Sequence, residues 1–177
     1  SAFGSPSEHF EIEGCKYSRS ALNYLLGLSL LKSTLPDFIP QTVLEIGGGF
    51  GTLGEILNQI PHYEIKYIDI DLPPVFFIAS EYIRNACSLD DNEYMLSSLN
   101  DSDDVIEISE LPRFSFLPSW EIEKLKGKID LFVNFISFQE MEPDVVSNYL
   151  SIVSSLDAEV ILLRNIKEGK QKATGGG

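Results

Sequence analysis

The sequence predicts an α/β protein with a doubly wound, mainly parallel β-sheet. Short apolar segments with the length of buried strands alternate along the chain with segments whose apolar residues recur at helical spacing. Strands that alternate with helices pair through crossovers, which places helices on both faces of a parallel sheet. A glycine-dense turn, residues 47–51, follows the first strand of the sheet, and ligands of such sheets bind beyond the carboxyl ends of the strands.

Length and composition fit one domain with an N-terminal extension. The chain has 177 residues, of which 44% are hydrophobic, and one domain averages about 150 residues. We expect a helical extension over residues 1–40, a cofactor-binding domain over residues 41–168, and a disordered or truncated tail over residues 169–177.

The apolar segment 21–31 predicts the helix of this extension. Lys16 and Arg19 precede it, as charged residues precede the apolar part of a signal peptide. Polar and small residues interrupt the segment, and it is much shorter than the roughly 20 residues that span a bilayer. We therefore expect a helix packed on the domain and no transmembrane segment.

Strands and helices then alternate through the domain. Strand 42–46 leads through the glycine turn into a helix that runs from Leu53 to Pro61, with apolar residues at i, i+3, i+4 and i+7. Strand 65–71 follows, and Pro73 opens the next helix. Residues 88–113 form a long connection in which residues 105–108 are a short strand or part of an acidic flap. The remaining elements are strand 113–117, a brief helix over 118–126, strand 129–135, a helix that begins at Pro143, and strand 159–164.

The glycine turn has the spacing of a nucleotide-type cofactor site. Residues 49–54 match G-x-G-x-x-G, which is typical of sites for nicotinamide or flavin dinucleotides. Asp71 lies 20 residues after Gly51, close to the interval of about 20 residues at which an acid meets ribose hydroxyls. An NAD(P)-dependent oxidoreductase is therefore one interpretation.

A second interpretation depends on Glu45, which lies two residues before Gly47. A carboxylate near a pyrophosphate repels it, whereas S-adenosylmethionine has no phosphate and carries an ammonium and a sulfonium. The register of Glu45 with Gly47, Gly49 and Gly51 resembles the first motif of the class I S-adenosylmethionine-dependent methyltransferases. This resemblance implies a Rossmann-like fold and S-adenosyl-L-methionine as the cofactor, and we favour it over the dinucleotide.

Further segments of the sequence indicate a particular family within this class of methyltransferases. The chain is similar to the sugar O-methyltransferases of bacterial surface-polysaccharide gene clusters from about Tyr17 to Gly169, and the run from Asn134 to Met141 is distinctive. This similarity implies methylation of a sugar hydroxyl in polysaccharide biosynthesis. The segments that carry it are 67–73, 117–123, 129–143 and 163–165.

The chain departs from the class at its end. Methyltransferases of this class continue past the fifth strand to a helix and an antiparallel pair, but the pattern here stops at Arg164. We therefore expect the fold to lack the C-terminal strands. One sheet edge is then exposed, which favours pairing between copies of the chain as a homo-oligomer.

The resemblance implies roles for the candidate cofactor-binding residues. The glycines let the backbone pass along the methionine portion, and Glu45 orients its ammonium. Asp71, with Asp69 in reserve, accepts hydrogen bonds from the ribose hydroxyls, and Ser119 and Trp120 flank the adenine. The complete set, with Tyr17 closing the cleft and Asn134 at the end of the fourth strand, is Tyr17, Glu45, Gly47, Gly48, Gly49, Gly51, Asp69, Asp71, Ser119, Trp120 and Asn134.

The catalytic candidates follow the fourth strand. Glu140 is the leading general base, because it lies just past that strand, where the acceptor enters. Gln139 is placed to hold a sugar hydroxyl, and His62 is a weaker alternative base. No metal site is expected, because clustered oxygen ligands are not evident.

Structural roles compete with these assignments. Glu45 is also suited to capping backbone donors in the turn, and Asp71 to capping the helix that Pro73 opens. Gln139 and Glu140 fit a solvated helix entry equally well. The competing role of Trp120 is packing in the hydrophobic core, and that of Tyr17 is packing against the N-terminal helix. For His62 it is a place on the surface without a catalytic role.

Charge and cysteine content limit the partners. The net charge is −14, from 27 acids and 13 bases, so a polyanion is repelled and nucleic acid is excluded as the acceptor. A small molecule or a glycan is expected instead. The two cysteines, Cys15 and Cys87, lack C-x-x-C spacing and indicate a reduced, cytoplasmic protein. A scaffold that binds S-adenosylmethionine or S-adenosylhomocysteine without catalysis is a third interpretation.

Overall fold

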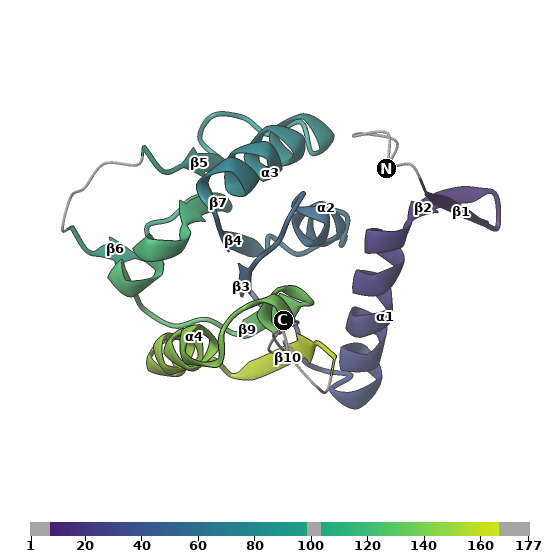
Figure 1. Ribbon diagram of the computed structural model, residues 1–177. Helices are drawn as coiled ribbons and strands as arrows, with labels where there is room; N and C mark the ends of the chain where they lie inside the picture. Colours follow the sequence, from purple (N-terminus) through teal and green to yellow (C-terminus); the bar gives the residue numbers. More distant parts are fainter. Residues whose placement is uncertain (1–7, 99–103, 167–177) are drawn as a thin grey trace, which may run out of the picture.

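The computed structural model describes residues 8–98 and 104–166, and a six-stranded sheet forms its centre (Figure 1). Its strands lie in the order β10-β9-β3-β4-β7-β5, and each neighbouring pair is parallel. The predicted parallel sheet is therefore confirmed. The strands are β3 (Thr42–Ile46), β4 (Lys66–Asp71), β5 (Tyr94–Leu96), β7 (Phe114–Pro118), β9 (Leu131–Phe135) and β10 (Val160–Arg164).

Helices cover both faces of the sheet, as the sequence predicts. One face carries α1 (Arg19–Thr34), α2 (Thr52–Asn58) and α3 (Pro73–Ala86), and the other carries α4 (Pro143–Ser155) (Figure 1). Two 3-10 helices, η1 (Ser119–Lys124) and η2 (Ser137–Glu140), follow β7 and β9 directly. Both therefore begin at the carboxyl end of the sheet.

Alternating side chains divide the core into two layers. In β3, Val43 packs toward α1, α2 and α3, while Leu44 packs toward α4. Both residues are completely buried. The period of two residues along a strand produces this division.

Several details differ from the sequence-based expectations. The hairpin of β1 (His9–Ile12) and β2 (Cys15–Ser18) precedes α1, although only a helix was predicted there. The brief helix predicted over 118–126 is η1 followed by β8 (Leu125–Lys126), which pairs with β6 (Ile106–Glu107) outside the main sheet. The short strand proposed within 105–108 is therefore present.

The two edges of the sheet are formed by β5 and β10. β5 lies inside the connection 88–113, where no strand of the main sheet was predicted. β10 leaves Ile161 and Leu163 about half exposed, so this edge strand has an uncovered apolar side. The predicted tail, 169–177, lies outside the described residues.

No helix in the described part of the chain has the length and apolar character needed to cross a membrane. Helix α1 instead packs on the sheet through Tyr24 and Gly27, which are buried. A Cβ at Gly27 would overlap the ring of Phe135, so the glycine lets the helix approach the sheet closely.

Candidate functional site

A cavity of about 500 Å³ opens where β3, β4, β7 and β9 end. It joins strand ends that are far apart in the sequence, as expected for a parallel sheet. Its volume falls within the range of about 300–1,000 Å³ that small-molecule sites occupy. We call it the Asp71 cavity, and its lining residues are Ile46, Gly47, Ile70, Asp71, Leu72, Val75, Ser119, Ser137, Glu140, Met141, Val145 and Tyr149.

The glycine turn borders this cavity in a conformation that only glycine adopts readily. Gly47, Gly49 and Gly51 have φ angles of +76°, +62° and +77°. A Cβ at Gly48 would lie 2.6 Å from Asp69 Oδ1, and one at Gly47 would overlap Ser137. A Cβ at Gly49 would meet no atom within 4 Å. The turn is thus packed tightly on its inner side and open at Gly49.

Two carboxylates bind the amides of the turn. The backbone amide of Gly48 donates to Asp69 Oδ1 at 3.3 Å, and that of Gly49 donates to Asp71 Oδ2 at 3.1 Å. The amide of Leu72 donates to Asp71 Oδ1 at 2.7 Å. Donors that face a phosphate in a dinucleotide site are therefore already paired with acids here.

Asp71 is half buried and lines the cavity, where its carboxylate is the main polar group from β4. Burial raises the pKa of Asp71, while the hydrogen bonds from Leu72 and Gly49 act in the opposite direction. The structural alternative, a cap on the following helix, is wrong, because Leu72 is the N-cap residue of α3 and no side chain caps this helix. The Asp71 side chain binds the amides of Gly49 and Leu72 and has a place on the cavity wall.

Glu45 lies behind the turn, away from the cavity lining. Its side chain is completely buried and accepts 2.6 Å hydrogen bonds from the hydroxyls of Tyr24 and Tyr67. Burial raises the pKa of Glu45 to about 7, against the opposing effect of the two tyrosine bonds. The predicted contact with a cofactor ammonium is not available in this arrangement, because α1 closes over the carboxylate. The cap on backbone donors is not formed either, since tyrosines are the donors.

Asp69 lies beside Glu45, because the two residues are partners in the β3–β4 register. Its side chain is completely buried, and Asp69 Oδ2 has no hydrogen-bond partner among the described residues. Burial raises the pKa of Asp69, and the charge of Glu45 raises it further. A buried carboxylate oxygen without a donor is costly, so this position suits a cationic or hydrogen-bonding group.

The far wall of the Asp71 cavity comes from η1 and α4. Tyr149 forms a side-chain hydrogen bond with Ser119, and burial raises the pKa of Tyr149. Trp120 is 46% exposed and lines a neighbouring cavity of about 380 Å³ that shares Ser119 and Tyr149 with the Asp71 cavity. Trp120 is therefore not a core residue, which excludes that structural role. Its side chain lines the neighbouring cavity and not the Asp71 cavity.

Asn134 supports the site from inside the sheet. Its Nδ2 donates to the carbonyl oxygen of Ile46 at 2.8 Å and to Ser137 Oγ at 2.6 Å. Its Oδ1 accepts from the backbone amide of Phe138 and from the side chain of Asn165, each at 3.2 Å. These bonds use both ends of the amide to position η2, and Asn134 is not among the residues that line the Asp71 cavity.

Three other candidates lie apart from the Asp71 cavity. His62 is exposed between α2 and β4, at the end of the sheet opposite the glycine turn, because α2 carries the chain back to the amino end of β4. Tyr17 belongs to the β1–β2 hairpin, which projects beyond α1 and away from the sheet (Figure 1). Gln139 faces another cavity across η2, whereas its neighbour Glu140 is exposed at the Asp71 cavity.

Sequence reasoning missed the apolar part of the site. Val145 and Tyr149 belong to the apolar face of the helix that was predicted to begin at Pro143, and only Val153 of α4 is buried. The exposed half of that apolar face lines the Asp71 cavity. A polar aromatic residue near the start of a helix that follows a site segment was the available signal. Leu72, Val75 and Met141 had no distinguishing signal.

The described residues offer neither a reactive cysteine thiol nor a cluster of metal ligands. Cys15 and Cys87 are unpaired, and burial raises the pKa of Cys87 to about 11, which keeps its thiol protonated. Within residues 8–98 and 104–166, no group of three or more His, Cys, Asp or Glu side chains is arranged to hold a metal ion.

Similarity to known proteins is confined to solved structures, since no protein-family model and no curated protein matches the chain. The methyltransferase domain of the bacterial protein CtHen1-CN superimposes with a TM-score of 0.56 at 13% identity, over 82% of this chain and 65% of that one. The mitomycin 7-O-methyltransferase MmcR gives a TM-score of 0.49 at 17% identity, over 89% and 43%. The plantazolicin methyltransferase BamL, crystallised with S-adenosylhomocysteine, gives a TM-score of 0.45 at 18% identity. The match covers 77% of this chain and 40% of BamL.

The chain spans less than two thirds of the length of each of these structures. At 13% identity, the likeness to the CtHen1-CN domain concerns the fold and not the substrate. The central parallel sheet with helices on both faces matches the methyltransferase fold that the sequence predicts.

Proposed function

We propose that the chain is an S-adenosylmethionine-dependent methyltransferase that binds its cofactor in the Asp71 cavity. The observation that carries the proposal is the pairing of the turn amides of Gly48 and Gly49 with Asp69 and Asp71. A dinucleotide needs such amides for its pyrophosphate and is repelled by nearby carboxylates. A cofactor with an ammonium, a sulfonium and no phosphate suits the same carboxylates.

The lining residues fit the parts of such a cofactor. Asp71 is the acceptor for ribose hydroxyls, and Gly47, which lines the cavity, brings the backbone of the turn alongside the methionine portion. Leu72 and Met141 offer apolar walls for adenine. When bound, the cofactor supplies a methyl group on a positively charged sulfur.

The acceptor in this proposal is a sugar hydroxyl, as the sequence resemblance implies. Glu140 is exposed at the rim of the Asp71 cavity and takes the hydroxyl proton as the acceptor oxygen gains the methyl group. Most of the rate enhancement is assigned to alignment of the two reactants in the cavity. The reaction is placed in the cytoplasm, in keeping with two unpaired cysteines.

Titration calorimetry tests the choice of cofactor. S-adenosylmethionine and S-adenosylhomocysteine are expected to bind, and NAD is expected to give no heat. Binding of NAD with no response to the sulfur compounds would replace the methyltransferase by an oxidoreductase.

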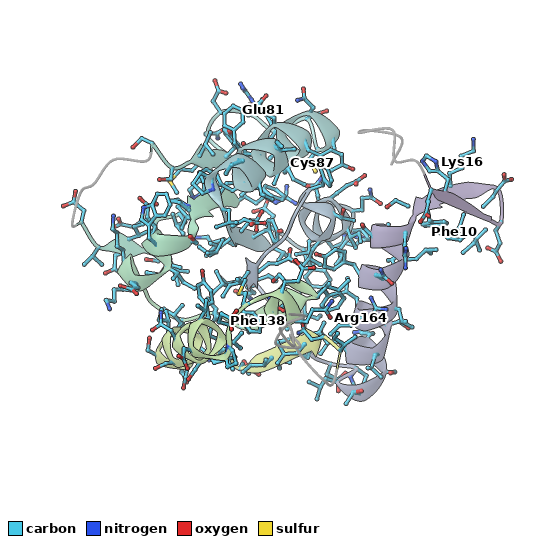
Figure 2. The ribbon with its side chains drawn as sticks, viewed as in Figure 1. Phe10, Lys16, Glu81, Cys87, Phe138 and Arg164 are labelled. Carbon is cyan, nitrogen blue, oxygen red and sulfur yellow. The ribbon has the colours of Figure 1, made fainter. Side chains whose placement is uncertain are left out.

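A comparison of variants tests catalysis against the scaffold alternative. Surface polysaccharide from cells that make the wild-type protein is expected to carry one more methylene on a monosaccharide than polysaccharide from cells that lack it, by mass spectrometry. Glu140→Gln should abolish this difference and retain S-adenosylhomocysteine binding, because the side chain acts on the acceptor. The matched control is Glu81→Gln, an exposed change on α3 far from the cavity (Figure 2). Unchanged methylation in Glu140→Gln would remove this residue from the role of base.

A further inference from the structure

Helix η2 separates the Asp71 cavity from another cavity of about 420 Å³. Ser137 and Glu140 of this segment line the Asp71 cavity, while Ile136 and Gln139 line the other. We call it the Arg164 cavity. Its remaining walls come from the start of α1 and the end of β10, which lie side by side, and Figure 2 shows Arg164 next to α1. The lining residues are Arg19, Ser20, Asn23, Ile136, Gln139, Arg164, Asn165 and Ile166.

The charge of this cavity is opposite to that of the chain. The protein has 27 acids and 13 bases, yet among the described residues two arginines and no carboxylate line the Arg164 cavity. The Asp71 cavity, on the other side of η2, is lined by two carboxylates, those of Asp71 and Glu140. A positive cavity beside a negative one distinguishes an anionic ligand group from a cationic one.

The positive charge is little compensated. The Arg19 guanidinium lies 3.8 Å from Glu8, but these side chains are 75% and 61% exposed, so the pair is weak. In the described part of the chain, Arg164 forms no ion pair. Guanidinium groups bind carboxylates and phosphates through paired hydrogen bonds, which makes these two arginines available to an oxyanion.

Amide side chains complete the wall, and hydrogen bonds within the protein fix two of them, Gln139 and Asn165. Gln139 Oε1 accepts from the backbone amide of Ile166 at 3.0 Å, and the backbone amide of Gln139 donates to Asn165 Oδ1 at 3.3 Å. The Nε2 group of Gln139 is the part of this side chain left for a ligand. It is a donor, as an anion requires.

Backbone strain marks the junction of the two cavities. Ile136 has a φ of +74°, a region that β-branched residues rarely occupy. Its amide donates to the carbonyl oxygen of Arg164 at 2.8 Å, and its own carbonyl oxygen accepts from the amide of Gln139 at 3.1 Å. Strained residues persist where the surroundings hold them and concentrate at functional sites.

We propose that the Arg164 cavity binds an oxyanion of the methyl acceptor, either a carboxylate or a phosphate group on a sugar. Arg19 and Arg164 provide the charge, and Asn23 and Gln139 provide amide donors. This inference rests on the proposed function, because an acceptor held here reaches across η2 to place a hydroxyl near Glu140. It makes the substrate an acidic or phosphorylated sugar and not a neutral one.

Calorimetry on the protein saturated with S-adenosylhomocysteine tests the inference with glucose 1-phosphate, glucuronic acid and glucose as probes. At least one charged sugar is expected to bind about tenfold or more tightly than glucose. The phosphate and carboxylate probes distinguish the two sources of the oxyanion. Arg164→Gln should remove the preference, and Arg19→Gln should weaken it. Arg84→Gln is the matched control, since this arginine lies on α3 and pairs with Asp91.

Three results would overturn the inference: equal affinity for charged and neutral sugars, no measurable binding of either charged sugar, or an unchanged preference in both arginine variants. Arg164→Lys provides a second variant that keeps the charge and should keep part of the preference if Arg164→Gln does not fold. Failure of S-adenosylhomocysteine to bind is a separate result that defeats the proposed function. Retained cofactor binding without charge selectivity defeats only this inference.

Discussion

Two sets of carboxylates at the ends of adjacent strands have different surroundings. Glu45 and Asp69 are completely buried between the sheet and α1, and two tyrosine hydroxyls hold Glu45. Asp71 and Glu140 lie on the wall of an open cavity. Only two positions along β4 separate Asp69 from Asp71, yet the first is sealed and the second is accessible.

The difference arises from what lies above each strand end. Tyr24 of α1 stacks on Phe135 with ring centroids 4.9 Å apart and covers Glu45. Asp71 is at the last position of β4, opposite Pro118, where the covering helices leave a gap. An acid in a cofactor motif thus either anchors a neighbouring helix or faces a ligand. Stability measurements and binding measurements separate the two roles.

The largest effect is expected on stability, from Glu45→Ala. This change leaves the hydroxyls of Tyr24 and Tyr67 buried without their acceptor and creates a cavity. We expect the free energy of unfolding to fall by about 4 kcal/mol, measured by urea denaturation followed by circular dichroism. Tyr24→Phe, which removes one of the two bonds, should cost less. A loss below about 1 kcal/mol for Glu45→Ala would show that the carboxylate does not anchor α1.

A pH dependence of stability follows from the same buried carboxylate. Burial raises the pKa of Glu45 from 4.5 to about 7, so the folded protein binds a proton that the unfolded chain releases between these values. Stability is therefore greatest below the lower value and falls as pH rises through about 7. The loss is about 3 kcal/mol from this group, and Asp69, whose pKa is also raised, contributes in the same direction.

Glu45→Gln isolates this contribution, because glutamine does not titrate. The difference in unfolding free energy between the wild-type protein and this variant should change steadily from about pH 5 to pH 7 and stay constant above pH 8. Thermal and urea denaturation over this range provide the measurement. A difference that does not vary with pH would mean that Glu45 is ionised throughout.

Much of the fold could be predicted, because buried parallel strands are continuous apolar runs. The segments 42–46 and 129–135 show this directly. The strand β5 was missed since its three residues are too few for a period and follow an acidic turn. The β1–β2 hairpin was missed for a related reason, because each of its strands has only four residues and most of their side chains are exposed.

The site could be located from sequence but not assigned residue by residue. Gly47, Asp71, Ser119 and Glu140 do line one cavity, because topology alone brings strand ends together. The direction of a side chain at a strand end depends on the helix that packs over it. Sequence spacing does not report that packing, so the burial of Glu45 beneath α1 was not foreseen.

The smallest expected effect, and the most direct test of the comparison, is on ligand binding in Asp71→Asn. The carboxylate is proposed to accept bonds from ribose hydroxyls, and a charged hydrogen bond contributes about 1.5–3 kcal/mol. Affinity for S-adenosylhomocysteine should therefore fall about 10- to 100-fold in calorimetry. The unfolding free energy should change by less than about 1 kcal/mol, because asparagine keeps an oxygen for the amide of Leu72 or Gly49. Glu81→Gln, which removes one charge from the exposed face of α3, should change neither quantity (Figure 2). If Asp71→Asn lowers stability as much as Glu45→Ala and leaves affinity intact, Asp71 belongs with the sealed carboxylates and the division between the two sets fails.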